Sequence, residues 1–130
     1  MAFLPPRKIR IIVAALLLSA PSAWAQRAFE EAMTKAEAGD AEAMGTVADM
    51  YFDGHWGPKQ DVATGLTWLR KSAEAGYVDA QVELADLYFK AKGPGYPAAD
   101  RAEAFKWYAL AAKQDSEKAV GQVADFYQRG

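Results

Sequence analysis

Few side chains of this 130-residue chain could take part in catalysis or metal binding. His55 is the single histidine and cysteine is absent, so the sequence offers neither a cluster of metal ligands nor a thiolate nucleophile. No nucleophile-elbow sequence occurs, and we expect His55 in a solvated loop. Gly93-Pro94-Gly95 predicts a turn, because a phosphate-binding loop also needs a lysine and the start of a helix. The sequence therefore predicts no enzyme activity, no cofactor and no metal site.

One acidic residue recurs at a constant place in the chain. Asp49, Asp86 and Asp125 each occupy the aspartate of the pattern Ala-x3-(Val/Leu)-Ala-Asp-apolar-Tyr. Phe52 and Phe89 lie three residues after the first two aspartates, on the same face of a helix. Carboxylates flanked by aromatic rings suit a basic or amphipathic peptide. The recurrence is equally typical of a polar face that only keeps a repeat protein soluble.

Helices must position these residues, because the apolar residues around them recur with helical period. The stripe in segment 78–91 consists of Ala80, Leu84, Leu87, Tyr88 and Ala91. Six helices are predicted, at about 27–38, 41–53, 61–75, 78–91, 100–114 and 117–129. The second, fourth and sixth share one pattern, called helix A, and the third and fifth share another, called helix B. The first resembles a helix B without its helix A, and the last a helix A without its helix B.

The predicted helix boundaries agree with capping residues. Asp61 and Asp100 stand where N-caps are needed, and Glu103 completes a capping box with Asp100. Gly39 and Gly76 fit the left-handed positions that end helices. At the third helix end of this kind, Asp115 replaces the glycine.

Two tryptophans recur at one place in helix B. Trp68 and Trp107 could form a platform for a ligand. Their helical spacing instead favours packing between repeats, which is our prediction.

The N-terminal 25 residues have the features of a signal peptide. Three basic residues precede an apolar run over 11–20, and Ala23-Trp24-Ala25 supplies small residues at a cleavage site. The run is too short for a transmembrane anchor, which needs about 20 apolar residues. We therefore expect a signal peptide at 1–25 and a mature chain at 26–130, in the periplasm or secreted, without stable membrane insertion.

The composition of residues 26–130 restricts the partners. This part holds 12 basic and 17 acidic side chains, a formal charge of −5. Nucleic-acid binding requires clustered Lys and Arg, and anionic membranes also attract basic segments. We expect neither as a partner, and without cysteine the domain must be held together by packing alone.

The two helix patterns together resemble the Sel-1-like repeat, a relative of the tetratricopeptide repeat. The helix B motif is matched by Asp61, Trp68, Leu69, Lys71, Ala73 and Gly76, and again by Asp100, Ala104, Trp107, Tyr108, Ala111 and Ala112. The helix A motif is matched by Tyr51, Tyr88 and Tyr127, although alanines (Ala48, Ala85 and Ala124) replace the first family glycine. The resemblance covers 41–130, with repeats at about 41–76 and 78–115, a partial repeat at 117–130 and a capping helix at 27–38.

The resemblance implies an all-α fold, a right-handed α-α superhelix of antiparallel helix pairs that acts as an adaptor in signalling or envelope assembly. In the tetratricopeptide architecture the place of Asp49, Asp86 and Asp125 faces the concave surface. The hypothesis is thus a periplasmic protein- or peptide-binding scaffold. The alternatives are a cell-wall (peptidoglycan) binding protein or hydrolase, and a structural subunit that self-associates weakly through its C-terminal helix.

Overall fold

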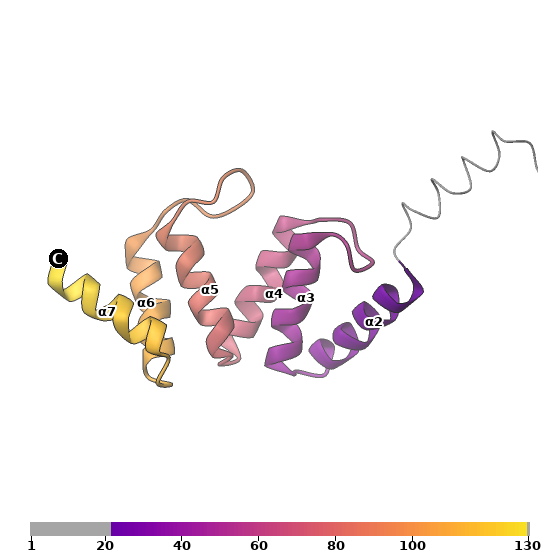
Figure 1. Ribbon diagram of the computed structural model, residues 1–130, viewed down its shortest axis with the longest axis horizontal. Coiled ribbons are helices and arrows are strands. Elements are labelled where there is room, and N and C mark those ends of the chain that lie inside the picture. The colour runs from indigo at the N-terminus through magenta and orange to yellow at the C-terminus, as the bar shows by residue number, and fades with distance from the viewer. Residues whose placement is uncertain (1–21, 130) are drawn as a thin grey trace, which may run out of the picture.

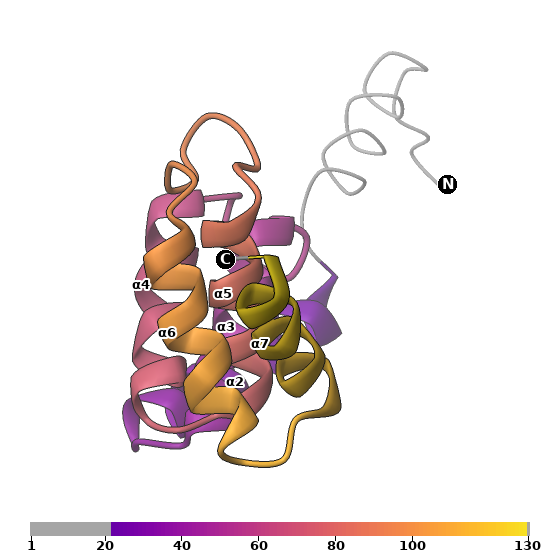
Figure 2. The same cartoon turned by 90° about the vertical axis from the view of Figure 1, so that its left-hand side faces the viewer.

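The computed structural model describes residues 22–129, which form six α-helices and no β-strand. The helices are α2 (Ala23–Glu37), α3 (Ala41–Asp53), α4 (Val62–Glu74), α5 (Val78–Phe89), α6 (Arg101–Ala112) and α7 (Glu117–Arg129). They follow one another along the long axis, and each packs mainly against its neighbours in sequence (Figure 1). Seen along that axis, α4 and α6 lie on one side and α7 on the other, with α5 between them (Figure 2). The predicted all-α solenoid is confirmed.

The predicted helix boundaries agree with the structure to within two residues, with one exception. Helix α2 begins at Ala23 rather than at residue 27, so the predicted cleavage point after Ala25 falls within its first turn. Alanine is the best helix former, and Ala25 is only 3% exposed, so the helix extends to it. Helix α5 ends at Phe89, and Ala91, assigned to that helix by the apolar stripe, is exposed in the next loop because Lys90 turns the backbone to an extended conformation.

The predicted caps are formed. The Asp61 carboxylate accepts a hydrogen bond from the Thr64 amide at 3.1 Å, and the Asp100 carboxylate accepts from the Glu103 amide at 3.1 Å. The predicted reciprocal contact of the capping box is not among the hydrogen bonds of the described residues; the Glu103 carboxylate pairs with Lys106 instead, at 3.8 Å. Helix α6 therefore has the N-cap hydrogen bond of the capping box, from the Glu103 amide to Asp100, without the return bond from the Glu103 side chain.

Left-handed residues end the helices as expected. Gly39 and Gly76 have φ of 100° and 96°, and Asp115 adopts the same region with φ of 60°. The two long loops close on equivalent hydrogen bonds, from the Asp61 amide to the Tyr51 carbonyl at 2.9 Å and from the Asp100 amide to the Tyr88 carbonyl at 2.7 Å. Loops of unequal length thus return the chain to the same place.

Small residues let helices A and B approach closely. Ala48 and Ala85 are fully buried, whereas Ala124 at the same place in α7 is exposed. Trp107 is buried in the core, and Trp68 is half-buried between two clusters of buried residues, so both tryptophans pack as predicted. The core therefore runs along the length of the solenoid between successive helices.

Candidate functional site

An acidic groove lies between α3 and α5 and has a volume of about 140 Å³. Its lining side chains include three carboxylates and a tyrosine: Asp49, Asp79, Glu83 and Tyr77. Gly45 allows the two repeats to come together, because a Cβ added there would lie 3.1 Å from the Tyr77 ring and 3.3 Å from the Ser72 hydroxyl. The walls of the groove are therefore set by the packing of one repeat on the next. We call this site the acidic groove.

Negative charge predominates in the acidic groove, although the charges of Lys92 and Lys118 partly offset it at Glu83. Burial raises the pKa of Glu83, and the charge of Asp49 raises it further. Partial burial likewise raises the pKa of Asp49, and Asp53 adds to the effect. The Tyr77 hydroxyl donates a hydrogen bond to Asp79 at 3.2 Å, and burial and that carboxylate together raise the Tyr77 pKa. Among the described residues no ion pair involves Asp49, Asp79 or Glu83, so a cationic partner would relieve an existing repulsion.

Asp86 has different surroundings from Asp49, although both hold the same place in the repeat. Its carboxylate accepts a short hydrogen bond from the Tyr108 hydroxyl of α6 and forms an ion pair with Lys118 of α7. Burial, followed by this hydrogen bond, raises the pKa of Tyr108. Asp86 therefore joins three helices, and its charge is already balanced within the chain.

The third aspartate and the two phenylalanines lie elsewhere. Asp125 is exposed and borders a separate hollow of about 160 Å³, together with Phe89 and Arg101. Phe89 is half-buried, with its ring 5.7 Å from that of Phe126. Phe52 is half-buried as well, and packs against Gly65 of α4. Only Asp49 of the five predicted binding residues lines the acidic groove, and their role in binding stays a prediction.

Sequence reasoning did not single out Asp79, Glu83 or Tyr77. Comparison of the repeats finds residues that recur, and these do not. The place of Glu83 is taken by Thr46 and Gln122 in the other A helices, and the place of Tyr77 by Asp40. These residues form a site because the packing of α5 next to α3 brings them together with Asp49 in one groove.

Other chemistry is sparse in the described part of the chain. Within residues 22–129, no group of three His, Cys, Asp or Glu side chains is arranged to hold a metal ion. His55 is exposed in the loop after α3. None of the helices found there is both long enough and apolar enough to cross a membrane.

Known proteins share the repeat and the fold. A family model described as "Sel1 repeat" matches residues 41–77 and 78–116. The structure is similar to the crystal structure of a Sel1 repeat protein from Oxalobacter formigenes, with a TM-score of 0.73 and 28% identity over 80% of this chain and 75% of that one. It is also similar to a protective antigen of uropathogenic Escherichia coli strains displaying an SLR fold, with a TM-score of 0.69 and 31% identity over 78% of this chain. This chain spans only 21% of that antigen. Among curated proteins, none matches the chain.

Proposed function

Because the chain belongs to the Sel1 repeat family, we propose that it is a binding scaffold for a basic protein or peptide and has no enzymatic role. The acidic groove between α3 and α5 is the proposed docking site. Asp49, Asp79 and Glu83 supply the negative charge, and Tyr77 supplies an aromatic wall. We place this activity in the periplasm, because residues 7–25 have the pattern of a signal peptide.

The observation that supports this proposal most is the difference between the two repeat boundaries. At the boundary of α5 with α6 and α7, Asp86 is balanced by Lys118. At the boundary of α3 with α5, the place of Lys118 is held by Asp79, so acidic residues face one another. Because Asp79 stands where the next repeat has Lys118, the acidic groove lacks the cation that balances Asp86. A lysine or arginine of a partner can take that place.

Capture of the partner, followed by binding kinetics, tests the proposal. The immobilised protein is exposed to an envelope extract beside the double variant Asp49→Asn/Glu83→Gln and a control, Glu74→Gln/Glu117→Gln, which makes the same change in charge at exposed positions outside the acidic groove. We expect the parent and the control to retain a basic protein that the groove variant loses.

With the captured protein in hand, association rates are compared at two salt concentrations. The groove variant should associate more slowly and with a weaker salt dependence, since surface charge acts mainly on the association rate. Equal capture and equal salt dependence for parent and groove variant would contradict the proposal.

A further inference from the structure

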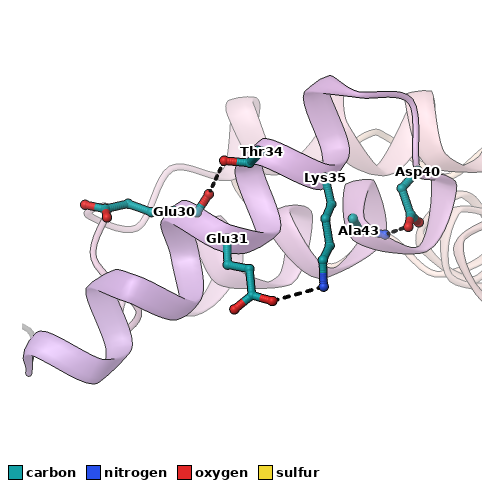
Figure 3. A network of polar contacts seen from close by, with 6 residues as sticks. All are labelled: Glu30, Glu31, Thr34, Lys35, Asp40 and Ala43. Carbon is teal, nitrogen blue, oxygen red and sulfur yellow. Dashed lines mark hydrogen bonds and ion pairs between the residues drawn. The ribbon is translucent and has the colours of Figure 1, made fainter.

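A second and larger groove, which we call the N-terminal groove, lies between α2 and α3. Its volume is about 390 Å³. The α2 wall consists of Ala28, Glu31, Ala32 and Lys35, and the α3 wall includes Ala43, Thr46 and Met50. Lys35 and Glu31 form an ion pair at 3.1 Å, and Asp40 at the end of the groove accepts from the Ala43 amide (Figure 3). The charged side chains of the α2 wall are therefore balanced by each other.

The N-terminal groove is equivalent to a place that a helix fills in the next repeat. Moving 37 residues along the chain takes Ala28 to Gly65 and Lys35 to Ser72. Helix α3 covers both of these residues: Phe52 lies over Gly65, and Gly45 faces Ser72. The equivalent position in α6, Ala104, is fully buried beneath α5, whereas Ala28 is only half-buried. The N-terminal groove thus has the shape of a seat for a helix A, and none of the described helices occupies it.

Helix α7 shares most of the sequence with which α3 packs on α4, although Gln128 takes the place of Phe52. Its segment Ala119-Val120-Gly121-Gln122-Val123-Ala124-Asp125 repeats the pattern Ala-x-Gly-x-Val-Ala-Asp of α3. Gly45 in α3 is needed for close approach, but Gly121 at the same place has nothing within 4 Å of an added Cβ. A glycine inside a helix lowers stability relative to alanine. No neighbouring side chain of the described structure requires a glycine at position 121, which is consistent with a close contact to another molecule.

The side of α7 that carries Gly121 is exposed in the described structure. Val120 and Tyr127 are 50% and 77% exposed, and Ala124 is exposed where Ala48 and Ala85 are fully buried. Of these positions, that of Ala124 faces the helix's own B helix, because the Ala48 carbonyl lies against Gly65 of α4. The position of Tyr127 faces the preceding B helix, where Tyr51 packs against Phe29 and Tyr88 accepts a hydrogen bond from Arg70. Helices α2 and α7 lie at opposite ends of the described structure (Figure 1), so the N-terminal groove and the exposed side of α7 are far apart within one molecule.

We propose that α7 of one molecule docks in the N-terminal groove of a second copy, in the register that α3 holds on α4. Gly121 then meets the wall at Lys35, and Ala124 and Gln128, the equivalents of Ala48 and Phe52, face α2 at Ala28. The contact joins two different surfaces, so it is head-to-tail, and repeated docking extends the solenoid from one molecule to the next. This inference does not depend on the acidic groove.

Sedimentation of the purified protein and of two variants tests the inference. Gly121→Gln blocks the docking helix, and Ala28→Arg fills the seat; the exposed replacement Thr67→Gln on α4 is the control. We expect the average mass of the parent and of the control to rise beyond that of a dimer with concentration. Each blocked variant should remain a monomer.

The decisive sample is an equal mixture of the two variants. Gly121→Gln retains an intact seat and Ala28→Arg an intact α7, so the mixture should form a dimer and grow no further. Thermal melting checks that each variant is folded, and Glu42→Arg, at an exposed position on the α3 wall of the seat and outside the acidic groove, replaces Ala28→Arg if that variant unfolds. A parent that stays monomeric at its highest soluble concentration, or a mixture that forms no dimer, overturns the inference. Variants of Asp49 and Glu83 should self-associate like the parent, which separates this result from the test of the proposed function.

Discussion

At the scale of single residues, Tyr108 and Asp86 show how one repeat position acquires different roles. Asp49, Asp86 and Asp125 are equivalent in sequence, yet within residues 22–129 only Asp86 meets a tyrosine hydroxyl and a lysine. The place of Tyr108 in α4 is taken by Leu69, which cannot donate a hydrogen bond. Asp86 therefore stabilises the packing of α5 on α6 and α7, whereas no ion pair of the described residues involves Asp49.

The two tryptophans of helix B should differ in their importance for stability. Trp107 is 7% exposed, so truncation to alanine should lower the free energy of unfolding by about 3–5 kcal/mol, the usual range for a buried large aromatic residue. Trp68 is half-buried, with Lys71 4.5 Å from its ring centroid, and Trp68→Ala should cost less. Urea unfolding measures both variants. An unchanged midpoint for Trp107→Ala would show that this residue does not belong to the core.

Neutralising Glu83 should stabilise the protein at pH 7. The folded-state pKa of Glu83 is above its ordinary value of 4.5, so the stability linked to this group is fully present below pH 4.5 and is lost as pH rises through the folded-state pKa. Glu83→Gln removes that loss, and its thermal midpoint should exceed that of the parent at pH 7 but not below pH 4.5. The exposed replacement Glu117→Gln is the control. A Glu83→Gln midpoint below that of the parent at pH 7 would mean that burial and the neighbouring carboxylates do not destabilise the charged form of Glu83.

At the scale of the helix, the glycines of α3 and α7 provide a matched pair. Gly121→Ala should raise the free energy of unfolding by about 0.5–1 kcal/mol, because the added methyl group meets nothing and alanine is the better helix former. Gly45→Ala should destabilise the protein, since its Cβ would lie 3.1 Å from the Tyr77 ring. Urea unfolding is measured at protein concentrations low enough for the monomer. Equal effects at the two positions would refute the different packing of α3 and α7.

At the scale of the whole molecule, the signal peptide that the sequence predicts for residues 1–25 overlaps the start of α2 at Ala23. Trp24 packs edge-on against Trp56 with ring centroids 5.3 Å apart, and both it and Ala25 lie before the predicted cleavage point. The walls of the N-terminal groove start at Ala28 and would survive cleavage. The intact mass of the protein from a periplasmic fraction should therefore correspond to a chain that begins at Gln26. A mass that still includes Met1 would rule out export by this route.

The sequence by itself determined the helices, their ends and their order. Helical period, N-capping aspartates and left-handed glycines act within a few residues, and the repeat reports each element two or three times, so local physical chemistry suffices to place Asp61, Asp100, Gly39 and Gly76. The start of α2 was missed because a helical run and a signal-peptide cleavage site can share the same alanines.

Only the tertiary structure decided which repeated residues form a site. Asp49 gains its surroundings from Asp79 and Glu83 on another helix, and Asp86 is balanced by Lys118, 32 residues further along the chain. Phe52 and Phe89 share a helix face with these aspartates in sequence, but each is held against the next B helix in the structure. A repeat pattern shows what successive units have in common, whereas charge balance and burial depend on the residues that meet across their boundaries, which differ from one boundary to the next.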